Sequence, residues 1–143
     1  MRNRKLLALC LGVSTVFLSG CPKDPYRAAI AGSDDVSQAV HSAIAITASY
    51  YSNGTFNDAQ KATAAKYYTI VTDCNMTFRK SVTGVHNSGE TGAAAFLPVA
   101  DGFVVCVKNS APVVADPKVA NVLKAVDTAI EGISLAVASA KAK

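Results

Sequence analysis

The chain contains no tryptophan and only two histidines, His41 and His86, which lie far apart. Its cysteines and histidines form no CxxC, HxxxH or CxxCH pattern, so the usual spacings of a zinc site and of covalent haem attachment are absent. Neither histidine has a GxSxG motif as partner, and the acidic residues are scattered. The sequence therefore predicts no catalytic residues, no metal site and no cofactor, and we interpret the protein as a non-enzyme.

Positive charge is also scarce once its position is considered. The chain has 14 Lys and Arg against 10 Asp and Glu, but three of the basic residues are Arg2, Arg4 and Lys5. No run of like charge in the chain exceeds two residues. Nucleic-acid binding needs clustered basic side chains on one face, so the composition argues against it.

The first 21 residues have the order of a secretory signal: the basic residues above, the apolar run Leu6–Leu18, then small residues. The tetrapeptide Leu18-Ser19-Gly20-Cys21 resembles the lipobox of bacterial lipoproteins at all four positions. This resemblance implies a signal peptide over residues 1–20, cleavage after Gly20, and acylation of Cys21. The alternative is an ordinary signal peptide with an incidental cysteine near its cleavage site.

The apolar run is too short to remain in the membrane as a helix. Leu6–Leu18 supplies 13 residues, whereas a membrane span needs about 20. Acylated Cys21 would instead hold the chain to the lipid bilayer, because each buried methylene contributes about 0.8 kcal/mol. The residue after the cysteine is Pro22 rather than the Asp that often retains such proteins at the inner membrane. We therefore expect an outer-membrane protein that faces the periplasm, with residues 21–24 as a tether and residues 25–143 as one helical domain.

Two cysteines remain for the mature domain, Cys74 and Cys106. Disulfides persist in an oxidising compartment such as the periplasm, so we predict that these two pair. Two free buried thiols and two metal ligands are the alternatives.

Local signals divide the domain into four helices. Asp24-Pro25 is a typical helix start, because Asp caps free N–H groups and Pro suits the first helical position. We expect Gly32-Ser33 to interrupt this first piece and Ser33 to cap a long helix over Asp34–Tyr51. After the turn at 52–55, Asn57 and Gln60 have the spacing of a capping box for a second helix, from about Asp58 to Thr83. This register would place His41 near Tyr67 or Tyr68, where we expect ordinary packing.

Gly84–Gly92 contains three glycines and is predicted to be a flexible loop. It carries His86, Asn87 and Glu90, which we take as a candidate contact loop, although such residues are usually only solvated.

The third helix is expected over Ala93–Lys108, with Pro98 and Gly102 favouring a kink or a split near Leu97. Phe103–Val107 is rich in β-branched residues, so a short strand is the alternative there. Asp116-Pro117 repeats the start signal, and a fourth helix is predicted from Pro117 to about Ala140. Its apolar residues recur every three or four positions and form one face: Val119, Leu123, Val126, Ile130, Ile133 and Val137.

Four helices with short links predict an all-α fold, a small up-down four-helix bundle with one disulfide. An αα-hairpin with a looser third helix is the nearest variant. Tethered helical modules commonly act through a surface, so we expect an accessory module that binds or assembles an envelope protein. Pilotins, small helical lipoproteins that escort secretin subunits, are similar in size and in having a disulfide, but only in architecture.

Other functions remain open. The terminal Lys143 allows comparison with the lipoprotein that is crosslinked to peptidoglycan through its last lysine, which would make the chain a structural envelope protein. Carriage of a small apolar ligand and an exclusion or immunity role in phage–host conflict are further alternatives. An enzyme is the least favoured class.

Overall fold

The computed structural model describes residues 24–140, so the predicted signal peptide, Cys21 and Lys143 lie outside the described residues. Four helices account for most of this part of the chain: α1 (Pro25–Ser52), α2 (Asp58–Asn87), α3 (Ala93–Ser110) and α4 (Pro117–Ser139). Within residues 24–140 there is no strand, and Phe103–Val107 is helical rather than extended. The all-α prediction is confirmed.

Three of the four helices begin with a side-chain cap that the sequence indicates. The side chain of Asp24 accepts a hydrogen bond from the backbone N–H of Tyr26 at 2.9 Å, and Asp116 accepts from Lys118 at 2.8 Å. Asn57 and Gln60 form a complete capping box, each side chain bonding the backbone N–H of the other residue. Side-chain caps of this kind satisfy the N–H groups that the first turn leaves unpaired.

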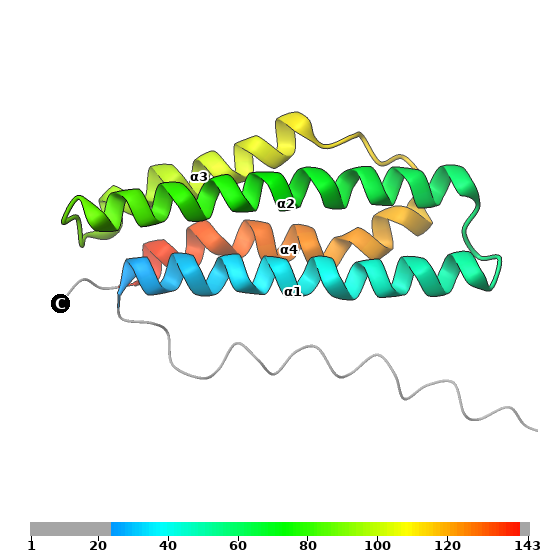
Figure 1. The fold of residues 1–143 in the computed structure, drawn as a ribbon, viewed down its shortest axis with the longest axis horizontal. Helices are drawn as coiled ribbons and strands as arrows, with labels where there is room; N and C mark the ends of the chain where they lie inside the picture. The colour runs from blue at the N-terminus through cyan, green and yellow to red at the C-terminus, as the bar shows by residue number, and fades with distance from the viewer. Residues whose placement is uncertain (1–23, 141–143) are drawn as a thin grey trace, which may run out of the picture.

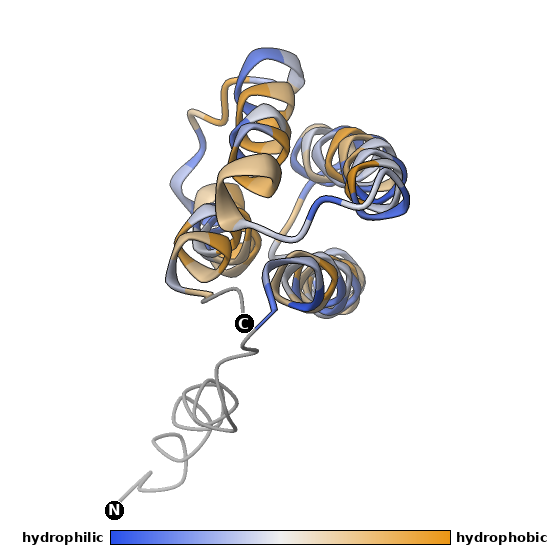
Figure 2. Ribbon diagram, turned by 90° about the vertical axis from the view of Figure 1, so that its left-hand side faces the viewer, coloured by the Kyte–Doolittle hydropathy of each residue, from blue (hydrophilic) through white to orange (hydrophobic). Residues whose placement is uncertain are grey.

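The helices run alternately up and down along one long axis (Figure 1). Each packs against its two neighbours in the order α1, α2, α3, α4 around the core, and α4 closes the ring by packing extensively on α1. In the view along this axis the four helices surround a common interior (Figure 2). The start of α1, the α2–α3 link and the end of α4 lie at one end of the bundle, which we call the entry end (Figure 1). The up-down topology is therefore as predicted.

The core is built mainly from valine and alanine, with a few larger side chains. Phe96, Leu123 and Ile133 are among its largest fully buried residues. All six residues of the predicted α4 face are buried. Small side chains bury little area each, at about 25 cal/mol per Å² of apolar surface, so the bundle relies on long helices packed closely together.

The predicted break at Gly32-Ser33 is wrong, because α1 continues through it. Gly32 is buried where α1 meets α4, and a Cβ atom built on it would lie 2.8 Å from Cγ1 of Ile133. The Ser33 hydroxyl donates to Oδ1 of Asn75 on α2 at 2.9 Å. Both residues thus serve contacts with other helices, which local sequence signals do not reveal.

Two other boundaries differ from expectation. Helix α2 extends to Asn87, four residues beyond the predicted end at Thr83, and so includes the first part of the predicted loop. Helix α3 runs without a break through Pro98, which occupies its second turn. The expected split near Leu97 does not occur.

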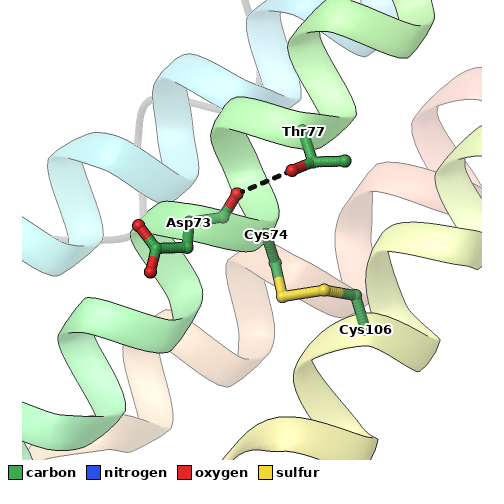
Figure 3. The surroundings of a disulfide bond; sticks show 4 residues. All are labelled: Asp73, Cys74, Thr77 and Cys106. Atoms are coloured by element: carbon green, nitrogen blue, oxygen red, sulfur yellow. Dashed lines mark hydrogen bonds between the residues drawn. A yellow bond between two sulfur atoms is a disulfide. The ribbon is translucent and has the colours of Figure 1, made fainter.

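A disulfide joins Cys74 on α2 to Cys106 on α3, as predicted, with Cα atoms 6.0 Å apart (Figure 3). Thr77, next to Cys74 on α2, donates its hydroxyl to the carbonyl oxygen of Asp73 at 3.1 Å (Figure 3). In the described part of the chain, α3 is also the one helix with the length and apolar composition to cross a membrane. Its buried residues and its disulfide nevertheless make it an integral member of the bundle.

Candidate functional site

The candidate contact loop is shorter than the sequence suggests. His86 and Asn87 belong to the last turn of α2, and only residues 88–92 link α2 to α3. The His86 ring stacks on Tyr26 of α1, with ring centroids 4.0 Å apart, while Glu90 is exposed in the link. The structure therefore brings His86 to α1 at the entry end and does not bring it together with Glu90 into one site. A contact role for His86, Asn87 and Glu90 stays a prediction.

Tyr67 and Tyr68, the predicted neighbours of His41, form hydrogen bonds with other residues. Tyr68 shares a 2.6 Å hydrogen bond with Thr47 and donates to the carbonyl of Ala43, while Tyr67 reaches α4. The Nδ1 atom of His41 lies 2.8 Å from the carbonyl oxygen of Ser37 on its own helix. His41 therefore shares no hydrogen bond with Tyr67 or Tyr68, and the register between α1 and α2 places it with Val71 and Thr72 at one hollow.

A buried polar group fixes that register between α1 and α2. The amide nitrogen of Asn75 donates to the carbonyl of Ser33 and to the hydroxyl of Ser37, each at 3.1 Å. Arg79 extends the group to the surface, where it pairs with Asp34. Among the described residues, no buried side-chain nitrogen or oxygen lacks a partner. Because these groups satisfy one another, we interpret them as structural.

Beside this group lies a first hollow of about 130 Å³ between α1 and α2, bordered by His41, Met76 and Arg79. Drug-sized ligands generally need about 300–1,000 Å³. The first hollow is too small for such a ligand, and the side chains of Ser37, His41, Asn75 and Arg79 at its border already have partners.

A second hollow of about 220 Å³ lies where α3 ends, away from the entry end. We call it the α3–α4 hollow. Its lining residues come from three helices and from the link after α3: Tyr67, Val107, Lys108, Ala111, Pro112, Val113, Asp127, Ile130 and Glu131. The link has no regular structure, and the side chain of Val113 within it is 94% exposed.

The polar side of the α3–α4 hollow is organised by Tyr67. This residue is buried, and its hydroxyl donates to Oδ1 of Asp127. Burial raises the pKa of Tyr67 far above its ordinary value, and the bond to Asp127 and the charge of Glu131 add to the rise. The hydroxyl therefore keeps its proton and stays a donor. Asp127 and Glu131 are one turn apart on α4, and both are exposed at the rim.

This arrangement was not predicted from the sequence. Asp127 and Glu131 flank Ile130 on the predicted α4 face, so the pair of like charges beside the apolar stripe was a readable signal. The approach of Tyr67 from α2 was not readable, because it depends on how α2 and α4 face each other across the bundle.

Metal chemistry finds no support in the described part of the chain. Across residues 24–140, no three side chains of His, Cys, Asp or Glu converge to hold a metal ion. No protein-family model, curated protein or solved structure matches the chain. The function must therefore be argued from the residues themselves.

Proposed function

We propose that this chain is a lipid-anchored protein of the bacterial envelope whose helical bundle binds and helps to assemble a protein partner. The observation that carries the proposal is the lipobox-like Leu18-Ser19-Gly20-Cys21 at the end of a short apolar run. We place the protein at the outer membrane, facing the periplasm, because Pro22 is not the residue that favours inner-membrane retention.

The described structure supports this proposal in two ways. The Cys74–Cys106 bond belongs to an oxidising compartment, as expected of an exported protein. Helix α1 begins at Pro25, only four positions after Cys21, so an anchor at Cys21 would keep the entry end close to the lipid. The 28 residues of α1 span about 42 Å at 1.5 Å per residue, which would carry the other end well away from the membrane surface.

Labelling with a radioactive fatty acid tests the anchor. We expect the wild-type chain to take up label and to sediment with outer-membrane vesicles in a density gradient. The Cys21→Ala variant should lose the label, whereas a variant at both disulfide positions, Cys74→Ser with Cys106→Ser, should keep it. An unlabelled wild-type chain in the soluble fraction would refute the anchor.

Photo-crosslinking in living cells tests the partner. A photoreactive residue placed at exposed Val113 or Leu135 should give a discrete crosslinked protein band if that surface meets a partner. Crosslinks to lipid alone, from every exposed position of the bundle, would contradict the binding role and favour a purely structural protein.

A further inference from the structure

We propose that the α3–α4 hollow binds an arginine side chain that an apolar segment of the partner protein presents. The inference rests on the proposed function for the existence of such a partner, and it assigns both the surface and the chemistry of the contact. Three observations carry it: an unneutralised pair of carboxylates, an apolar wall beside them, and an opening of side-chain size.

The carboxylates are the polar half of the site. Asp127 and Glu131 lie at positions i and i+4 on α4, where like charges repel each other. Asp127 accepts a hydrogen bond from the hydroxyl of Tyr67. Because this hydroxyl is neutral, the bond orients the carboxylate but does not cancel its charge. Within residues 24–140 the one ion pair joins Arg79 to Asp34 on the other side of the bundle, so it neutralises neither carboxylate. An external cation would relieve the repulsion.

Two neighbouring carboxylates favour the planar guanidinium group of arginine over a compact cation such as an ammonium group. Arginine presents five N–H donors in one plane and can serve two carboxylates at once. Glu131 and the second oxygen of Asp127 are available as acceptors, because the Tyr67 hydroxyl bonds only Oδ1.

The apolar half lies next to these acceptors. Val107 and Ile130 are buried at the base of the α3–α4 hollow, while Pro112 and Val113 form its outer wall. A methylene stem can pack on such a wall while its charged head stays with the carboxylates. The almost complete exposure of Val113 leaves apolar surface for a neighbouring residue of the same partner segment.

Lys108 borders the same hollow from the end of α3. Its ammonium group makes no ion pair with Asp127 or Glu131 in the described structure. With Lys108 counted, the lining carries a formal charge of about −1, so it still attracts a cation, but Lys108 competes for the same carboxylates. Removal of the Lys108 charge should therefore strengthen binding of a cation, which is not expected if Asp127 and Glu131 have only a structural role.

The probe is the peptide acetyl-Leu-Arg-Val-amide, added to the full chain purified in detergent and followed by amide NMR shifts. We expect saturable shifts at Ala111, Val113 and Ile130. The same peptide with citrulline, which has nearly the shape of arginine but no charge, should bind much more weakly.

Matched variants separate charge from shape. Glu131→Gln should weaken arginine-peptide binding by about 1.5-fold to fivefold, the range expected for an exposed ion pair. Asp73→Asn removes one carboxylate charge from the exposed side of α2 and should leave binding unchanged. Lys108→Met should strengthen binding, because it removes the competing cation.

Equal binding of the arginine and citrulline peptides, or an unchanged affinity in Glu131→Gln, would overturn the assignment. Absence of shifts would overturn it as well. Failure of the site is distinguishable from failure of the proposed function. If the peptide does not bind but crosslinks form in cells from other surfaces, the chain has a partner and only the arginine site is refuted. If the peptide binds but the chain carries no lipid, the arginine site stands and the proposed lipid anchor is refuted.

Discussion

The hydroxyl of Tyr67 on α2 donates a hydrogen bond to Oδ1 of Asp127 on α4, which joins two helices that face each other diagonally across the bundle. Neighbouring helices share extensive contacts, whereas α2 and α4 meet only sparingly. This bond therefore ties the two hairpin halves of the bundle and also positions one carboxylate of the α3–α4 hollow.

Replacing Tyr67 by Phe should cost about 0.5–1.5 kcal/mol of unfolding free energy at neutral pH, the usual net value of a hydrogen bond. Under alkaline conditions, the two proteins should also differ in how steeply the free energy of unfolding falls as pH rises. The pKa of Tyr67 is raised in the folded chain from an ordinary value of 10.0, so this residue contributes stability that is present below pH 10 and is lost as pH rises further. Urea unfolding between pH 8 and about pH 11 should show a flatter decline for Tyr67→Phe than for the wild type.

Tyr50→Phe is the matched control, because Tyr50 is an exposed residue at the end of α1. It should leave the alkaline decline unchanged. Parallel declines for wild type and Tyr67→Phe would show that the pKa of Tyr67 is not raised in the folded chain.

Two glycine substitutions should act in opposite directions. Gly32→Ala would place a methyl group 2.8 Å from Cγ1 of Ile133, and we expect overpacking to lower stability by about 1–3 kcal/mol. Gly84→Ala lies within α2 with no neighbour within 4 Å, so it should raise stability by about 0.5–1 kcal/mol through helix propensity. Thermal unfolding of both variants measures the difference. A stabilised Gly32→Ala protein would mean that α1 and α4 are less closely packed than described.

Asp116 should govern part of the acid sensitivity. A hydrogen bond from Gln60 on α2 lowers the pKa of Asp116, and backbone N–H groups of Val119 and Lys118 lower it further. Because the folded pKa is below the ordinary value of 3.8, this stabilisation is present above that pH and is lost as pH falls through the folded pKa.

Asp116→Asn should therefore be less stable than the wild type at pH 7 and should lose less stability on acidification from pH 5 to about pH 2. Asp73→Asn on the exposed side of α2 is a suitable control. Identical acid unfolding of wild type and Asp116→Asn would contradict the link between α2 and α4 through Gln60.

The disulfide should contribute about 3–4 kcal/mol, the chain-entropy value for a loop closed over 32 residues. The double variant Cys74→Ser, Cys106→Ser should unfold at a lower urea concentration than the oxidised wild type, and a reductant should shift only the wild type. If the reductant shifts neither protein, Cys74 and Cys106 are not bonded in solution.

The features that could be read from the sequence are those that depend on near neighbours along the chain. Asp24, Asn57 and Asp116 cap helices through bonds to residues two or three positions away, and the α4 face follows from its own period. The Cys74–Cys106 pair followed from elimination once compartment and number were considered.

The features that could not be read depend on contacts between helices. Gly32 and Ser33 have the composition of a break, yet Ile133 and Asn75 make a continuous helix favourable there. Pro98 removes one backbone hydrogen bond, yet α3 continues through it, and Phe96 and Phe103 on either side are buried in the core. The α3–α4 hollow likewise arises only when Tyr67, Lys108 and Asp127 come together from three helices.

The shared location of the start of α1 and the end of α4 has a topological consequence (Figure 1). A circular permutant could connect these two ends through a short linker and open new termini in the exposed turn at Asn53 and Gly54. Such a chain would keep every helix pairing while it moved the proposed anchor to the opposite pole, so that the bundle would be inverted relative to the proposed membrane surface.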